Sequence, residues 1–120
     1  MKDNSAQNNL EDFNIYNYIL KYRKPIPCND IRKFGRFFVY HKRRVRRTYF
    51  KNGFVSTVFL GIDHKFGNDG PPLLFETMIY MNGEFTDYQT RCSTWRQALR
   101  MHWDAVDWVK HQSKTAFINL

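Results

Sequence analysis

Two Asn-Gly pairs, at positions 52–53 and 82–83, constrain the fold of this chain more than any other feature of its sequence. Each pair stands between two runs of strand length, and Asn-Gly is the preferred centre of the tight turn that joins two antiparallel strands. The sequence therefore predicts two β-hairpins that together form a four-stranded, mainly antiparallel sheet. The predicted strands span residues 43–50, 54–62, 72–81 and 84–92.

A two-residue turn at each Asn-Gly pair also determines which residues face each other across the strands. In the first hairpin it places Thr48 opposite Thr57, and in the second it places Glu76 opposite Gln89. Because side chains alternate between the two faces of a strand, Arg44 is predicted to share a face with Thr48.

The segment before the first hairpin predicts one short helix. Asn29 or Asp30 carries a side chain that caps helices, and the helix is predicted to run from there to about Tyr40. Prolines make residues 24–27 extended, whereas residues 10–20 fit a helix and a short strand equally well. Ile31, Phe34, Phe37 and Phe38 recur at helical spacing, and the three phenylalanines are predicted to form the core face of the helix.

A second helix is predicted from Trp95 to about His111, with Ser93 or Thr94 as its cap. Apolar side chains recur in it at intervals of three and four, so one face should pack on the sheet. Met101 and Trp108 fall on the far side, which indicates a partner or dimer surface, or simply two isolated exposed side chains. The predicted sheet-facing residues are Trp95, Ala98, Leu99, His102, Val106 and Val109.

These elements predict a single α+β domain. A chain of 120 residues, 18% of them aromatic, has enough apolar volume for one core. The domain is placed at residues 11–112, between a flexible polar tail (residues 1–10) and a C-terminal tail (residues 113–120). No apolar run approaches the ~20 residues that span a bilayer, and no signal peptide is recognised, so we expect a soluble protein without membrane association.

The two cysteines, Cys28 and Cys92, match no metal-ligand spacing. They are predicted to be reduced thiols that pack as small apolar groups, with a disulfide as the alternative. No metal site and no cofactor is predicted from them.

The net charge of +8 is concentrated in one part of the chain. Twelve of the nineteen Lys and Arg residues lie between Lys21 and Lys51, where Asp30 is the one acidic residue. A patch of this kind binds polyanions by releasing counterions, or attracts an acidic protein, although the same charge also serves simply to keep a surface soluble. The predicted binding residues are Lys42, Arg43, Arg44, Arg46, Arg47 and Lys51.

Asp63, His64 and Glu76 are the candidates for catalysis. They lie at or near the ends of two predicted strands, and His102 is predicted to face the same sheet. If these side chains met in one cleft, they would bind a divalent metal or carry out acid–base chemistry. The alternative is structural: Glu76 pairs across the strands with Gln89 and Arg91, Asp63 caps its loop, and His64 bonds to the backbone.

The segment V-S-T-V-F-L-G-I-D-H, followed by P-P-L-L-F-E-T-M, resembles a family of small uncharacterised proteins encoded by bacteriophages and prophages. The resemblance covers roughly residues 18–110. It includes Pro25 to Cys28, Asp30-Ile31 with Phe34, and, further on, Tyr88, Arg91, Thr94-Trp95, Ala98 and His102. This chain is more basic than its relatives at residues 42–47. The resemblance implies a phage-type origin and no particular chemistry. Since no signal peptide is recognised, we expect the protein in the cytoplasm of a host cell.

Charge and resemblance together predict a small phage accessory protein that acts by binding rather than by catalysis. The expected partner is nucleic acid, a nucleoprotein or an acidic host protein, with the effect of countering a host defence or redirecting host machinery. Two alternatives stay open: a small metal-dependent enzyme or metalloprotein centred on Asp63, His64 and Glu76, and an oligomeric structural component that uses the C-terminal helix.

Overall fold

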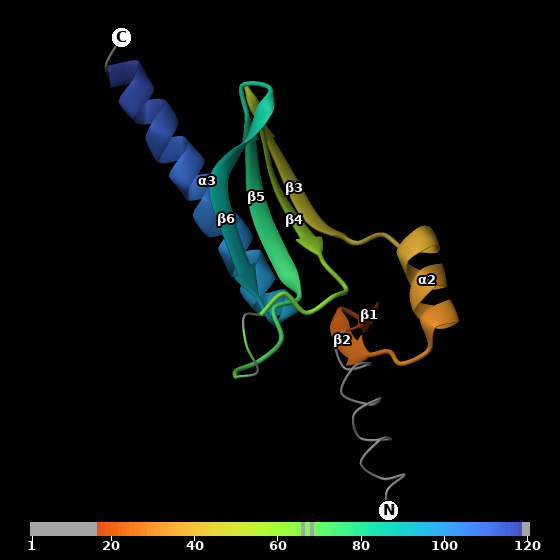
Figure 1. Ribbon diagram of the computed structural model, residues 1–120. Helices are drawn as coiled ribbons and strands as arrows, with labels where there is room; N and C mark the ends of the chain where they lie inside the picture. Colours follow the sequence, from red (N-terminus) through yellow and green to blue (C-terminus); the bar gives the residue numbers. More distant parts are fainter. Residues whose placement is uncertain (1–16, 66, 68, 119–120) are drawn as a thin grey trace, which may run out of the picture.

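The protein is an α+β fold built on a four-stranded antiparallel sheet (Figure 1). The computed structural model describes residues 17–65, 67 and 69–118, and for residues 113–118 it describes the backbone alone. Consecutive strands are neighbours, so the sheet is a simple meander, as the two predicted hairpins require. Its strands are β3 (Arg44–Phe50), β4 (Gly53–Phe59), β5 (Phe75–Met81) and β6 (Glu84–Cys92).

A second, two-stranded sheet precedes the first helix. It consists of β1 (Tyr18–Lys21) and β2 (Lys24–Pro27), so residues 18–20 adopt the strand that was one of their two predicted conformations. Its turn residues, Tyr22 and Arg23, both have positive φ (52° and 67°), which residues other than Gly and Asn rarely adopt. The turn therefore carries no sequence signal, and for that reason this hairpin was not predicted.

The predicted register of the first large hairpin is wrong by two residues. Its turn is Lys51-Asn52, and Thr48 faces Val55 instead of Thr57. Gly53 is the first residue of β4, where a Cβ atom would overlap the Tyr80 carbonyl oxygen of β5. The glycine is thus required by the close approach of two strands and not by the turn.

The second large hairpin turns at Asn82-Gly83, as predicted, with φ of 56° and 91°. Its register changes between Met78 and Tyr80, because β6 contains a bulge there. As a result Glu76 faces Arg91, and the predicted pairing of Glu76 with Gln89 is wrong in register.

Helix α2 (Ile31–Tyr40) begins after Asp30, whose carboxylate accepts hydrogen bonds from the backbone N–H groups of the first turn. This confirms Asp30 as the N-cap. Phe37 is buried and Phe34 and Phe38 are half-buried, as predicted, whereas Ile31 is 80% exposed. Ile31 is the first residue of the helix, and the contacts of α2 with the core begin only at Phe34.

Helix α3 (Trp95–Ile118) lies across one face of the four-stranded sheet and contacts all four strands (Figure 1). The Thr94 hydroxyl accepts from the Gln97 N–H, while the Gln97 amide oxygen accepts from the N–H groups of Ser93 and Thr94. This reciprocal cap fixes the predicted start of the helix. The helix continues to Ile118, beyond the predicted end near His111, so residues 113–118 of the predicted tail are helical. The predicted tail at residues 1–10 lies outside the described residues.

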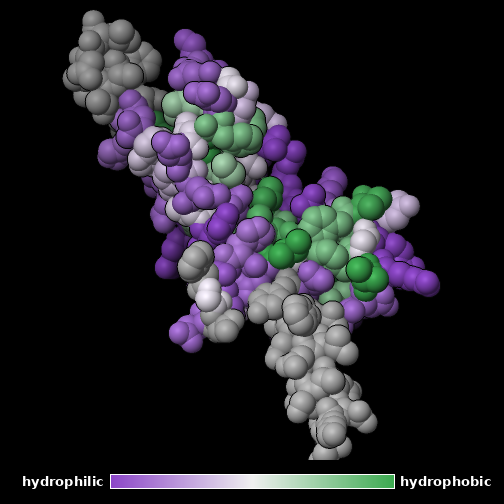
Figure 2. Space-filling model, viewed as in Figure 1, coloured by the Kyte–Doolittle hydropathy of each residue, from purple (hydrophilic) through white to green (hydrophobic). Residues whose placement is uncertain are grey.

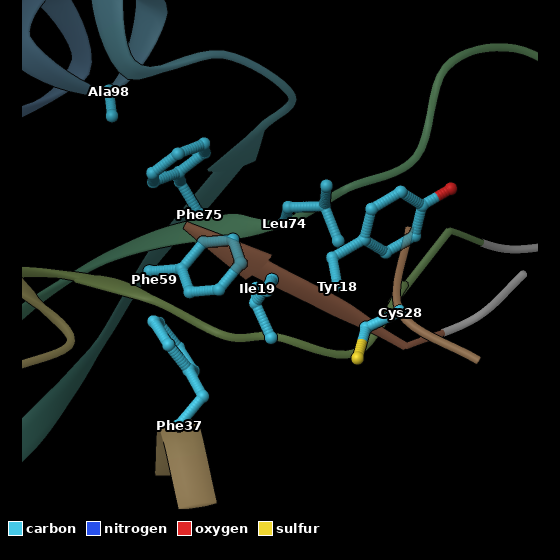
Figure 3. Close-up of a cluster of buried hydrophobic side chains, with 8 residues drawn as sticks. All are labelled: Tyr18, Ile19, Cys28, Phe37, Phe59, Leu74, Phe75 and Ala98. Atoms are coloured by element: carbon cyan, nitrogen blue, oxygen red, sulfur yellow. The ribbon is translucent and has the colours of Figure 1, made fainter. Parts of the chain in front are cut away.

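Two apolar clusters form the core. The first joins the end of the sheet to the β1–β2 hairpin, α2 and the start of α3; in Figure 3 the ring of Phe37 points from α2 toward Phe59, beside Phe75. The second lies between the sheet and α3 and consists of Val55, Ile79, Ala105, Val106 and Val109. One face of the four-stranded sheet is therefore covered by α3, and the other face is turned away from the helix.

Candidate functional site

Asp63 closes the loop between β4 and β5. One of its carboxylate oxygens accepts from the backbone N–H groups of Lys65 and Leu73, both at 2.9 Å, and the side chain is only 2% exposed. Lys65 Nζ lies 3.6 Å from the other oxygen. These contacts tie both ends of the loop to one side chain, which is the structural role that the sequence offered as the alternative to catalysis.

The other candidates for catalysis do not gather around Asp63. His64 is exposed, and its Nδ1 lies 2.7 Å from the Ile62 carbonyl oxygen. Glu76 accepts from Gln89 Nε2 at 2.8 Å and from Arg91 Nε at 2.9 Å, so its charge is neutralised across the strands. Within the described residues, no group of three or more His, Cys, Asp or Glu side chains is arranged to hold a metal ion.

His102 is fully buried between α3 and the sheet. Its two ring nitrogens each lie 2.8 Å from a hydroxyl, Nε2 from Thr48 and Nδ1 from Thr57, and Thr57 is bonded in turn to Thr77. Burial, assisted by the nearby charge of Arg46, lowers the pKa of His102 from 6.5 to about 4. The imidazole is therefore neutral at pH 7 and links three strands to the helix, out of reach of any substrate.

Both cysteines are free thiols, as predicted. Cys28 is buried, and partial burial raises the pKa of the half-buried Cys92 to about 11. A thiol of this kind is a poor nucleophile at neutral pH.

Three of the predicted binding arginines lie over aromatic rings. The guanidinium carbon of Arg43 is 4.2 Å from the ring centroid of Phe38, that of Arg46 is 4.7 Å from Trp103, and that of Arg47 is 4.3 Å from Phe54. Such cation–π contacts fix the plane of the guanidinium group and leave its edge available to donate hydrogen bonds. The other three predicted residues, Lys42, Arg44 and Lys51, are exposed.

The basic residues of β3 are divided between the two faces of the sheet. Arg46 lies on the face covered by α3, where it contacts Trp103 of that helix. Arg47 lies on the opposite face, in contact with Phe54, as the alternation of side chains along the strand predicts. A bulge between Arg44 and Arg46 pairs Arg44 with Val58, so the prediction that Arg44 shares a face with Thr48 is wrong.

The face turned away from α3, here called the open face, carries a row of four aromatic side chains that the sequence did not single out. They occupy neighbouring positions in consecutive strands: Tyr49 faces Phe54, Phe54 faces Tyr80, and Tyr80 faces Phe85. The row lies beside the hairpin turns, and Figure 2 shows apolar surface at that end of the sheet. We call these residues the aromatic row: Tyr49, Phe54, Tyr80 and Phe85.

The rings of the aromatic row are in mutual contact. Phe54 and Tyr80 are stacked, with centroids 5.0 Å apart and planes 12° apart, and Phe85 meets the edge of Tyr80 at 5.1 Å. Tyr49 lies 5.8 Å from Phe54 at the other end. A hydrogen bond from the Arg47 guanidinium holds the pKa of Tyr49 below its ordinary value of 10. The two ends of the row are exposed: Tyr49 by 68% and Phe85 by 53%.

The predicted interface residues of α3 are in different surroundings. Met101 is half-buried against the first core cluster, so its predicted position on the far side of the helix is wrong. Trp108 is 39% exposed and contacts Tyr88, with ring centroids 5.3 Å apart. Trp103, which the sequence pattern did not single out, is 44% exposed beneath Arg46.

No helix in the described part of the chain is both long and apolar enough to cross a membrane. Comparison of the chain with protein-family models, with curated proteins and with solved structures found no match.

Proposed function

We propose that this protein is a small accessory protein that binds nucleic acid through the basic residues of β3 and its flanking segments. The observation that carries the proposal is the position of Arg43 and Arg47, whose guanidinium carbons lie over aromatic rings, 4.2 and 4.3 Å from the ring centroids. An arginine fixed in this way loses little side-chain freedom when it donates to a phosphate.

A second basic feature lies close by in the sequence. A groove between β1 and α2 is lined by Lys21, Lys33 and Arg36, together with the aromatic ring of Tyr40. With Asp30 engaged as the cap of α2, little negative charge opposes these cations between Lys21 and Lys51. Concentrated positive charge attracts a polyanion at long range and gains affinity by counterion release.

The setting is also part of the proposal. The resemblance of the central segment to phage proteins supports action in the cytoplasm of a host cell, against a host defence or on host machinery. A catalytic role has less support, because Asp63 is engaged with backbone, Glu76 with Arg91, and His102 is buried.

The proposal predicts salt-dependent binding that depends on exposed cations near β3. The variant Lys42→Gln, Arg44→Gln, Lys51→Gln removes three charges and leaves every stacked arginine in place. Affinity for fluorescein-labelled nucleic acid, single-stranded and duplex, is measured by anisotropy between about 50 and 200 mM salt. If all three cations contact phosphates, the slope of log K against log salt should become shallower by about 2 to 3.

A matched control removes the same charge elsewhere. Arg96→Gln, Arg100→Gln, Lys110→Gln changes three exposed cations of α3 and should leave the slope close to that of the native protein. Equal losses in the two triple variants would show that net charge alone is responsible, and would contradict the proposed surface. Binding of an acidic protein in place of both nucleic acids would contradict the choice of ligand.

A further inference from the structure

We infer that the open face binds unpaired bases, so that the nucleic acid recognised by this protein is single-stranded. The inference rests on the proposed function and adds the class of nucleic acid and the residues that select it. It is carried by the aromatic row, which stands beside the basic residues of β3 but contains no charge itself.

The size of the aromatic row suits a short run of bases. Adjacent strands are about 4.8 Å apart, so a row across four strands extends over about 14 Å. Sheets that bind single-stranded RNA stack two or three bases on aromatic side chains. Here Tyr49 and Phe85 provide the exposed rings, 68% and 53% accessible, while Phe54 and Tyr80 support them from the centre.

Arg47 adds a polar group at the centre of the row. Its guanidinium carbon lies 4.3 Å from the ring centroid of Phe54. Arg47 Nε is buried and out of reach of a ligand, but the terminal N–H groups of a guanidinium are also donors, and they suit the carbonyl and ring-nitrogen acceptors at the edge of an unpaired base. In a duplex these edges are paired and the faces of the bases are stacked on one another. Only the sugar–phosphate backbone would then be accessible to the rings of the aromatic row.

The charges at the two edges of the sheet indicate where the phosphates run. Lys51 and Arg44 are exposed at the β3 edge, whereas Glu84 and Asp87 are exposed on β6. Phosphates are attracted to the first edge and repelled from the second. The strand should therefore run along β3 and extend its bases over the row.

The test compares two double variants that each remove two exposed rings. Tyr49→Ala, Phe85→Ala removes the ends of the aromatic row, and Tyr22→Ala, Trp108→Ala removes rings that are 93% and 39% exposed and lie outside both the row and the basic groove. The probes are a fluorescein-labelled oligothymidylate of about 12 nucleotides and a duplex of the same length, read by anisotropy. Circular dichroism checks the fold of each variant.

We expect the native protein to prefer the single strand. Loss of the row should weaken binding of the single strand about tenfold or more, because each stacked base contributes substantially to affinity. The salt slope and the affinity for duplex should stay close to native, and the control variant should bind both probes as the native protein does.

Failure of the inference can be told apart from failure of the proposed function. Equal native affinity for duplex and single strand, or native-like single-strand binding by the row variant, would overturn the inference while leaving binding by the basic residues in place. No binding of either probe at about 50 mM salt would overturn both.

Discussion

The buried imidazole of His102 predicts a specific dependence of stability on pH. In the folded protein its pKa is lowered to about 4, whereas in the unfolded chain it returns to 6.5. Between these two values the unfolded chain binds a proton that the folded protein does not, so the free energy of unfolding falls as pH falls. The stabilising contribution is complete above pH 6.5 and is lost as the pH approaches 4.

The size of the effect follows from the shift of the pKa. Each unit corresponds to about 1.4 kcal/mol, so the shift of His102 amounts to a loss on the order of 3 kcal/mol between neutral pH and pH 4. Urea unfolding at intervals of about half a pH unit measures this loss directly. The comparison is with His102→Gln, which keeps an amide between Thr48 and Thr57 but has no proton to gain.

The difference between native protein and variant isolates His102 from the carboxylates, which also titrate in this range. His64→Gln is the control, because it removes an exposed histidine outside the network. NMR titration of the native protein gives an independent measurement that does not depend on the stability of the variant. Imidazole resonances of His102 that titrate near pH 6.5, or equal pH dependence in native protein and His102→Gln, would refute the reasoning.

Further stability predictions concern backbone space, the Asp63 loop and the aromatic row. Gly53→Ala should lower the melting temperature strongly, by the equivalent of about 3 kcal/mol, because the added Cβ would overlap the backbone of β5. Gly35→Ala lies in open space on α2 and should instead stabilise the protein by about 0.5–1 kcal/mol. Asp63→Ala leaves two backbone N–H groups without an acceptor and should cost about 2 kcal/mol by urea unfolding. Phe54→Thr, at the centre of the row, should lower the free energy of unfolding by about 2 kcal/mol. Tyr49→Thr, at the exposed end of the row, should lower it by less than about 1 kcal/mol, and equal losses would contradict the packing described.

The fold class was predictable because it depends on features that tolerate errors of register. The first hairpin is shifted by two residues from the predicted pairing, and an even shift leaves the side chains from Arg46 to Phe50 on their predicted faces. Thr48 still faces the helix, and the sheet still buries the same side. The error arose because Gly53 has two readings in sequence, a turn residue or a residue without room for a side chain, and only the position of β5 decides between them.

The aromatic row was harder to predict, because its members meet only when four strands are in register. One local signal was present in the sequence: Tyr49 and Phe54 flank the first turn with the same spacing as Tyr80 and Phe85 around the second. The concentration of cations was evident from the sequence, whereas their contacts with aromatic rings were not predicted. Those contacts depend on tertiary neighbours such as Trp103, which lies more than fifty residues away from Arg46 in the sequence.

The two faces of the four-stranded sheet meet different physical demands. Under α3 the polar groups of Thr57, Thr77 and His102 form hydrogen bonds with one another. These bonds offset the free-energy cost of burying polar side chains. The open face has no such constraint, since a sheet covered on one side is stable with polar residues on the other. Exposed rings there reduce solubility, and the net charge of +8 counteracts this. Under the proposed function, the same cations would neutralise phosphates when bases cover the rings, so one charge distribution would serve both the exposed rings and the binding of nucleic acid.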